Sequence, residues 1–246
     1  MSHPSPPDRR EVSVAARLVL ASCIASAAAP GALAAGGGGA GEDPEGHVIL
    51  RVDGEEVTKA DLDASVAYRK TYVAGRSDAD LARAAIEDEL IPIAALKAKF
   101  KDRLPEMRKK VEEMRARVLA GEAFENVARA GSECPSSAQG GDLGFFPRTQ
   151  MVPPFARHAF TLRKGEVSET FVTVFGVHFL TVTDYKKGPT AGADEARASH
   201  VLVMFDKSPQ FRNQLQAIQQ GAKVEVVDAA YADLVPAKPA GGKNKN

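Results

Sequence analysis

The sequence predicts an α+β fold, with helices in the first half of the chain and strands in the second. Between residues 58 and 130, apolar residues recur every three or four positions, as on one buried helix face. Between residues 171 and 205, short runs place apolar residues on one face at every second position, as in strands. A glycine-rich stretch, residues 132–146, separates the two regions and carries Cys134.

Composition limits the function classes. The chain has 246 residues, which suggests one or two domains. Lys plus Arg number 32 and Asp plus Glu number 32, so the net charge is zero and nucleic acid is not expected as the main partner. No apolar run is long enough for a membrane span in the mature protein.

The N-terminus has the pattern of a signal peptide. Three arginines precede an apolar stretch that ends in the small-x-small motif Ala32-Leu33-Ala34. Residues 1–34 are therefore predicted to be removed on export, which favours a periplasmic or otherwise exported bacterial protein. The alternative is a lipoprotein anchored through Cys23. With Cys23 removed, Cys134 would be a single thiol without an internal disulfide partner, and hence a structural or a functional group.

The predicted elements begin with a flexible linker at residues 35–46, which is rich in glycine. A strand at 47–52 is followed by the hairpin turn Asp53-Gly54, and Thr58 should cap a helix that stops near Gly75. His47 is the first residue of this strand, and the sequence does not indicate which residue its side chain contacts. A second helix is expected at 78–101, kinked or split by Pro92 because proline removes a backbone hydrogen bond.

Further helices are expected from Pro105 to Gly121 and over residues 124–130. After the glycine-rich loop, a helix at 155–162 would carry His158 on its surface. Strands are predicted at 171–175, 177–185 and 198–205, then a helix from Ser208-Pro209 to Gly221 and a short strand at 223–228. The tail after residue 235 is predicted to be disordered.

Several motifs together resemble the parvulin family of peptidyl-prolyl isomerases, over about residues 106–185. They lie in the family's order and spacing, and are residues 122–132, Gly140-Gly-Asp-Leu-Gly-Phe-Phe146, Gln150-Met151, Phe155, Gly165-Glu-Val-Ser168 and Phe175-Gly-Val-His178. The flanking parts resemble the foldase chaperones that carry parvulin domains. Thr149 departs from the family, which has glycine there.

The resemblance implies a four-stranded antiparallel sheet with surrounding helices. It also implies a helical chaperone-like module at 47–103, an isomerase domain at 104–207, a C-terminal helix and return strand at 208–235, and a tail at 236–246. Carried over by position, Cys134 falls on the family's catalytic-loop residue, His178 on one of its paired histidines and Thr173 beside them. Leu143, Met151 and Phe155 fall on its proline-binding pocket.

One family feature is displaced in this chain. The opening strand with its Ser-His motif is missing before the first helix of the domain, and residues 93–100 carry no histidine. The motif appears later, as Ser199-His200. We hypothesise a circular permutation that places His200 opposite His178, because an empty central slot would expose two rows of backbone groups. The alternative is that 198–221 begins a truncated second domain.

The resemblance, together with the signal-peptide pattern, implies an isomerase that helps exported, proline-containing chains to fold, with no cofactor. Met151, Phe155 and Phe160 could instead be plain core, and Cys134 and His178 could be structural. Metal is disfavoured because no two ligands have zinc-site spacing. A chaperone that binds unfolded chains without catalysis is the second hypothesis, favoured by the displaced strand. A scaffold without either activity is the third.

Overall fold

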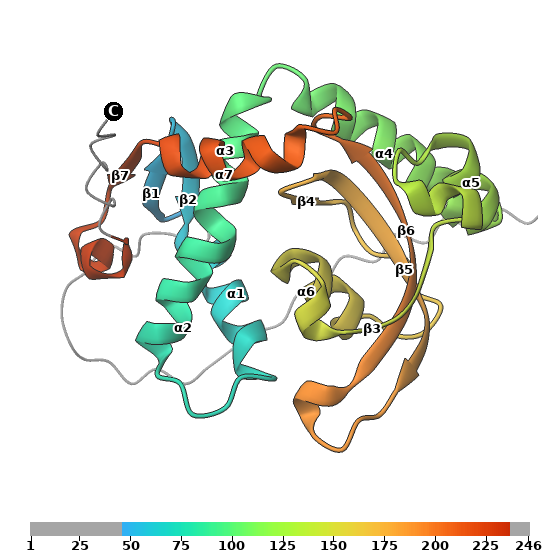
Figure 1. Cartoon of the computed structure of the whole chain (residues 1–246), viewed down its shortest axis with the longest axis horizontal. Coiled ribbons are helices and arrows are strands. Elements are labelled where there is room, and N and C mark those ends of the chain that lie inside the picture. Colours follow the sequence, from blue (N-terminus) through green and yellow to red (C-terminus); the bar gives the residue numbers. More distant parts are fainter. Residues whose placement is uncertain (1–45, 237–246) are drawn as a thin grey trace, which may run out of the picture. The chain divides into compact units, whose positions relative to one another are not determined.

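The computed structural model describes residues 46–236, which form two antiparallel sheets and the helices packed on them (Figure 1). A three-stranded sheet has the order β2-β1-β7, and a four-stranded sheet has the order β3-β6-β5-β4. The predicted α+β class and the four-stranded antiparallel sheet are confirmed. The predicted signal peptide, most of the linker and nearly all of the C-terminal tail lie outside the described residues.

The small sheet joins the two ends of the described chain. Strands β1 (Val48–Val52) and β2 (Glu55–Thr58) form a hairpin, and β7 (Val224–Val226) pairs with the other edge of β1. Asp53 and Gly54 both have positive φ, at 51° and 88°, as a tight two-residue hairpin turn requires. His47 bonds Asp228 at 2.8 Å, so the partner that the sequence did not reveal comes from beyond β7.

The helices beside the small sheet begin at the capping residues that the sequence indicates, but α1 ends at Lys70, before the expected stop at Gly75. Thr58 and Asp61 form a capping box that starts α1 (Lys59–Lys70). Pro92 splits the next helix into α2 (Asp78–Ala85), a π-helical turn (Ile86–Leu90) and α3 (Ile91–Lys99). The π turn bonds the Ile91 N–H to the Ile86 carbonyl, and Pro92, which has no N–H, follows directly.

Helices α4 (Leu104–Leu119), α5 (Phe124–Gly131) and α6 (Pro153–Thr161) belong to the larger sheet. Proline lies in the first turn of α4 and of α6, where its missing N–H costs nothing. Helix α7 (Phe211–Gly221) packs on α3. Its residues Phe211 and Leu215 belong to the core against the larger sheet, and Ile218 packs against that core and against the core of the small sheet.

The larger sheet brings together strands that are distant in sequence. Its members are β3 (Asp142–Pro147), β4 (Phe171–Thr173), β5 (Gly176–Lys186) and β6 (Glu195–Met204). Strand β6 comes last in sequence among these four strands but lies between β3 and β5 and pairs antiparallel with both. The late strand therefore fills a central position in the sheet.

The two faces of this sheet are covered by different helices (Figure 1). Val177, Phe179, Val201 and Val203 face α4 and α5. On the other face, Leu180, Val182 and Ala198 pack with Phe155 of α6. This division follows from the alternation of side chains along a strand.

Three expectations need correction. The glycine-rich stretch is not a loop throughout, because residues from Asp142 onward form strand β3. Strand β6 starts at Glu195, three residues before the expected start, because its first residues pair with both neighbours. His158 is half-buried and stacks on Phe171, so it is not a surface residue. Within residues 46–236, no helix is both long and apolar enough to span a bilayer.

Candidate functional site

His178 and His200 lie on neighbouring central strands and point to the same face of the sheet. The register pairs His178 with Leu202 and Leu180 with His200, so the two histidines are diagonal neighbours. Their Nδ1 atoms are 3.4 Å apart and their rings are stacked with centroids at 5.6 Å. Strand pairing between segments 22 residues apart thus builds the histidine pair.

A chain of hydrogen bonds runs through the pair. The Thr173 hydroxyl oxygen accepts the Phe175 backbone N–H at 3.1 Å and is 2.8 Å from His178 Nε2. If the hydroxyl donates to Nε2, the proton of His178 is on Nδ1 and bonds His200 Nδ1; the reverse direction is equally consistent. Either way, the bond needs one protonated and one unprotonated Nδ1, so the two imidazoles cannot both be charged.

Burial favours the neutral state of each ring. His178 and His200 are 2% and 5% exposed. Burial, with smaller effects of His200 and His158, lowers the pKa of His178 well below its usual value. Burial also lowers the pKa of His200 to about 4. The Nε2 atom of His200 is buried and has no hydrogen-bond partner in the described part of the chain, so it is the open end of the network.

Phe155 closes the site on the helix side. Its ring meets His178 and His200 edge-on, at centroid distances of 5.9 Å and 5.4 Å. Leu143 and Met151 are half-buried and pack against the same apolar cluster. The three residues expected to form a proline pocket therefore meet in one cluster beside the histidines, and two of them remain partly accessible.

Cys134 is less closely involved than the histidines. It is partly buried at the start of a short 3-10 turn (Pro135–Gln139), and within residues 46–236 no hydrogen bond joins its thiol to His178 or His200. The segment before it runs beside β6, because the Glu133 N–H donates to the Leu202 carbonyl at 2.7 Å. The structure thus brings Thr173 and the two histidines together and leaves Cys134 on the adjoining loop.

Gly141 allows the same loop to lie directly against the backbone of His200. Its φ is 84°, and the His200 N–H donates to its carbonyl at 3.0 Å. A Cβ at this position would lie 2.4 Å from the His200 carbonyl oxygen. The second glycine of the Gly140-Gly141 pair is therefore required by its backbone conformation and by contact with β6.

His158 is a residue of this region that the sequence argument missed. Its ring stacks on Phe171 with centroids at 4.0 Å and an interplanar angle of 19°, and Phe171 in turn stacks on His178. Burial, with the nearby Arg157 charge, lowers the pKa of His158 to about 4. A usable signal was its spacing of three residues from Phe155, which puts both on one face of α6.

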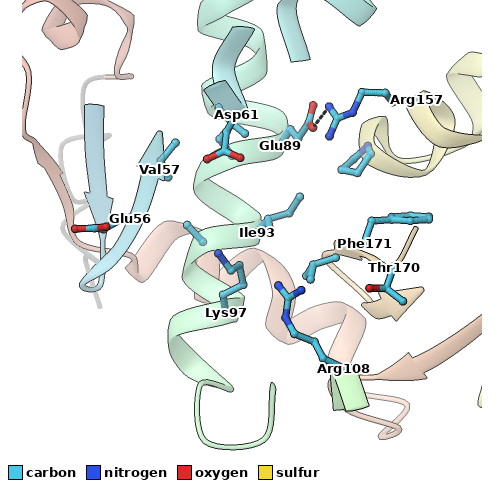
Figure 2. A pocket seen from close by; sticks show the side chains of 14 residues that line it. Glu56, Val57, Asp61, Glu89, Ile93, Lys97, Arg108, Arg157, Thr170 and Phe171 are labelled. Carbon is cyan, nitrogen blue, oxygen red and sulfur yellow. Dashed lines mark hydrogen bonds and ion pairs between the residues drawn. The ribbon is translucent and has the colours of Figure 1, made fainter. Parts of the chain in front are cut away.

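A cavity of about 250 Å³ lies next to the site, between β2 and α3 on one side and α4, α6 and β4 on the other (Figure 2). Phe171 lines it and also stacks on His178, so the cavity and the histidine pair share one ring. Figure 2 shows Arg157 reaching across to Glu89, a buried carboxylate, at 2.8 Å. Its charged lining residues are Glu56, Asp61, Glu89, Lys97, Arg108 and Arg157.

Comparison with known families agrees with the resemblance seen in the motifs. The PPIC-type PPIASE domain of the Rotamase family matches residues 91–184. The match includes His178 and Thr173 and ends before His200. No solved structure matches the chain.

Curated relatives carry foldase and chaperone names. The chain is 30% identical to the foldase protein PrsA of a Geobacillus species over 164 residues, which is 62% of this chain and 59% of the relative. It is 36% identical to PrsA of Geobacillus kaustophilus over 62% of this chain and 58% of the relative. It is 35% identical to the chaperone SurA of Alcanivorax borkumensis, over 42% of this chain and 24% of the relative. The chain thus spans less than two thirds of these relatives.

Proposed function

We propose that the protein catalyses cis-trans isomerisation of X-Pro bonds in exported polypeptides, and the match of residues 91–184 to the PPIC-type PPIASE domain of the Rotamase family supports this proposal. The observation that carries this proposal is the neutral, hydrogen-bonded set of Thr173, His178 and His200 beneath the ring of Phe155. The foldase and chaperone names of the relatives agree with a role in protein folding.

The reaction needs no bond to be broken. An X-Pro amide isomerises slowly because its C–N bond must lose resonance as it twists, with a barrier of about 20 kcal/mol. A catalyst must therefore bind the twisted amide better than the planar one. The twisted amide carries less charge on its oxygen, so an apolar surface of Phe155, Leu143 and Met151 favours it.

The histidine network has the polar role in this mechanism. His178 and Thr173 hold the ring orientation of His200 and couple its proton position to their own, and its Nε2 is left open. A neutral pair avoids placing a full charge beside an amide that is losing its own polarity. Cys134 contributes, in this proposal, a nearby polar group and makes no covalent attack.

The proposal also assigns His200 to the displaced opening strand of a circularly permuted domain. Its support is the central place of β6 between β3 and β5, and the register that sets His200 beside His178.

The proposal further divides the chain into segments with separate roles. Residues 1–34 act as a signal peptide, residues 47–103 and 208–235 form a chaperone-like module, and residues 104–207 are the isomerase domain. The pairing of β7 with β1 supports a module built from both ends of the chain. Lipidation at Cys23 is the alternative to cleavage after Ala34.

A proline-limited refolding assay tests the proposed activity. The purified protein should accelerate refolding of a substrate whose slow phase is X-Pro isomerisation. His178→Ala should reduce kcat/KM by about tenfold or more, because it removes the centre of the network. Cys134→Asp should keep most of the activity. A wild-type protein that folds but gives no acceleration would overturn the proposal.

The residue that precedes proline in the substrate provides a second test of the proposed function. No basic cluster accompanies the glycine-rich stretch, so the protein should show no preference for phosphorylated Ser or Thr before proline. A peptide library with paired phosphorylated and unphosphorylated members measures this directly. A strong preference for the phosphorylated members would contradict the expectation.

The second candidate function is a chaperone that holds unfolded chains without catalysis. The cavity in Figure 2 favours it, because β2 and β4 are both edge strands and both line this cavity. Edge strands leave main-chain donors and acceptors unpaired, and an extended polypeptide can pair with them. Suppressed aggregation of an unfolded client, together with no acceleration of proline-limited refolding, would favour this function over the first.

A further inference from the structure

We propose that His158 is a positioning residue for the histidine pair: its imidazole, stacked on Phe171, holds that ring against His178 and keeps the pair aligned. The inference rests on the proposed isomerase function. It assigns a role to a residue on α6 that touches neither the hydrogen-bond chain nor the catalytic rings directly.

The geometry is a ladder of four rings from four different elements. His158 of α6 stacks on Phe171 of β4 at 4.0 Å, and Phe171 stacks on His178 of β5 at 5.4 Å with planes 10° apart. His178 then stacks on His200 of β6 at 5.6 Å. Each ring is therefore nearly parallel to the next, and a tilt of the Phe171 ring would change its stacking contact with His178.

Helix α6 supports this ladder in two directions. Phe155 meets Phe171, His178 and His200 edge-on, at 6.0 Å, 5.9 Å and 5.4 Å. His158, three residues later, meets the ladder face-on at its end. One helix face thus supplies both the wall of the site and the ring that ends the stack.

Phe171 needs such support because of where it lies. It belongs to β4, a three-residue edge strand, and it also lines the cavity of Figure 2. Without His158, the Phe171 ring could turn toward that cavity and leave His178 with no stacking partner on β4. His158 is uncharged near neutral pH, since burial lowers its pKa to about 4, so its contact with Phe171 is ring stacking.

A pair of matched variants tests the role. His158→Leu fills a similar volume without a ring, and His158→Phe keeps a ring. Thr161→Ala, one turn further along α6 on an exposed position, is the control. With a proline-containing peptide, we expect His158→Leu to lower kcat about fivefold with little change in KM, as for loss of one aromatic contact felt in the transition state. His158→Phe and Thr161→Ala should stay within about twofold of wild type.

A spectroscopic readout separates positioning from mere stability. Nitrogen-15 NMR of the imidazoles reports the tautomers of His178 and His200, which His158→Leu should mix or exchange and His158→Phe should preserve. Wild-type kcat and wild-type spectra in His158→Leu would overturn the inference, as would equal impairment in the Leu and Phe variants. If wild type itself shows no isomerase activity, the proposed function fails, and the spectra alone then decide the positioning role.

Discussion

At the scale of single residues, the site depends on keeping two imidazoles neutral inside the protein. Two charged imidazoles could not share the bond between the two Nδ1 atoms, and burial disfavours a charge on either ring. The same burial links the site to stability. His200 has a folded-state pKa of about 4 against an ordinary value of 6.5, so between these pH values the unfolded chain binds a proton that the folded chain does not.

Stability should therefore be full above about pH 6.5 and fall as the pH drops toward 4. His200 alone should contribute a loss on the order of 2–3 kcal/mol between pH 7.5 and pH 4.5, from the pKa of about 4. Chemical denaturation of wild type and His200→Gln at both pH values measures it. The variant should lose less stability on acidification; equal losses in both proteins would contradict the assignment.

At the scale of elements, the contact between the glycine-rich stretch and β6 decides where His200 lies. Gly141 bonds the His200 N–H, and the Ser132 hydroxyl and the Glu133 N–H bond Leu202 on the same strand. These hydrogen bonds pair backbone groups of β6 in the part of the strand that β3 does not reach. The stretch is thus held in position against β6 by close backbone contact.

Gly141→Ala should be markedly more destabilising than Gly144→Ala. Both glycines have positive φ, at 84° and 66°, so each alanine costs about 1–2 kcal/mol in backbone strain. Only Gly141 has a neighbour in the way, the His200 carbonyl oxygen at 2.4 Å, whereas Gly144 has open space. We expect a further loss of about 1–3 kcal/mol for Gly141→Ala, measured by denaturant unfolding. Equal losses for the two variants would show that the contact is unimportant.

At the scale of the whole molecule, side chains from α6 and from the segment after β3 contact residues of α1 and of the π-helical turn. Arg157 of α6 bonds Glu89 in the π-helical turn, and Ser65 of α1 donates to the other oxygen of Glu89 at 2.6 Å. Arg148 lies 4.0 Å from the Phe160 ring centroid and 5.8 Å from that of Tyr68. Helix α6, which carries Phe155 and His158, is thus held from the histidine side and from the α1 side.

Glu89 is 2% exposed, so removing Arg157 should leave a buried carboxylate short of one partner. Arg157→Met should lower the unfolding free energy by about 2–3 kcal/mol, and adding Glu89→Gln should recover part of this loss. A double-mutant cycle measured by denaturant unfolding gives the coupling. Additive effects of the two substitutions would mean that the ion pair contributes nothing specific across this contact.

Local chemistry let the sequence predict most elements. The Asp53-Gly54 turn, the Thr58 cap, the Pro92 split and the alternation along β5 depend on neighbouring residues only, and each is found as expected. The glycine-rich stretch was harder to interpret, because β3 forms only where β6 is available to pair with it. His158 was missed because its partner, Phe171, comes from another element.

The sequence by itself determined the α+β class, the parvulin-type motifs and the candidate residues Thr173, His178, Phe155 and Met151, since these follow from residue type, order and spacing. The tertiary structure alone decided which side chains meet. It set His200 beside His178, left the Cys134 thiol outside the hydrogen-bond chain and placed His158 on the ring stack. The reason is that strand order and register are fixed by pairing between distant segments, and one residue of register moves a side chain to the opposite face.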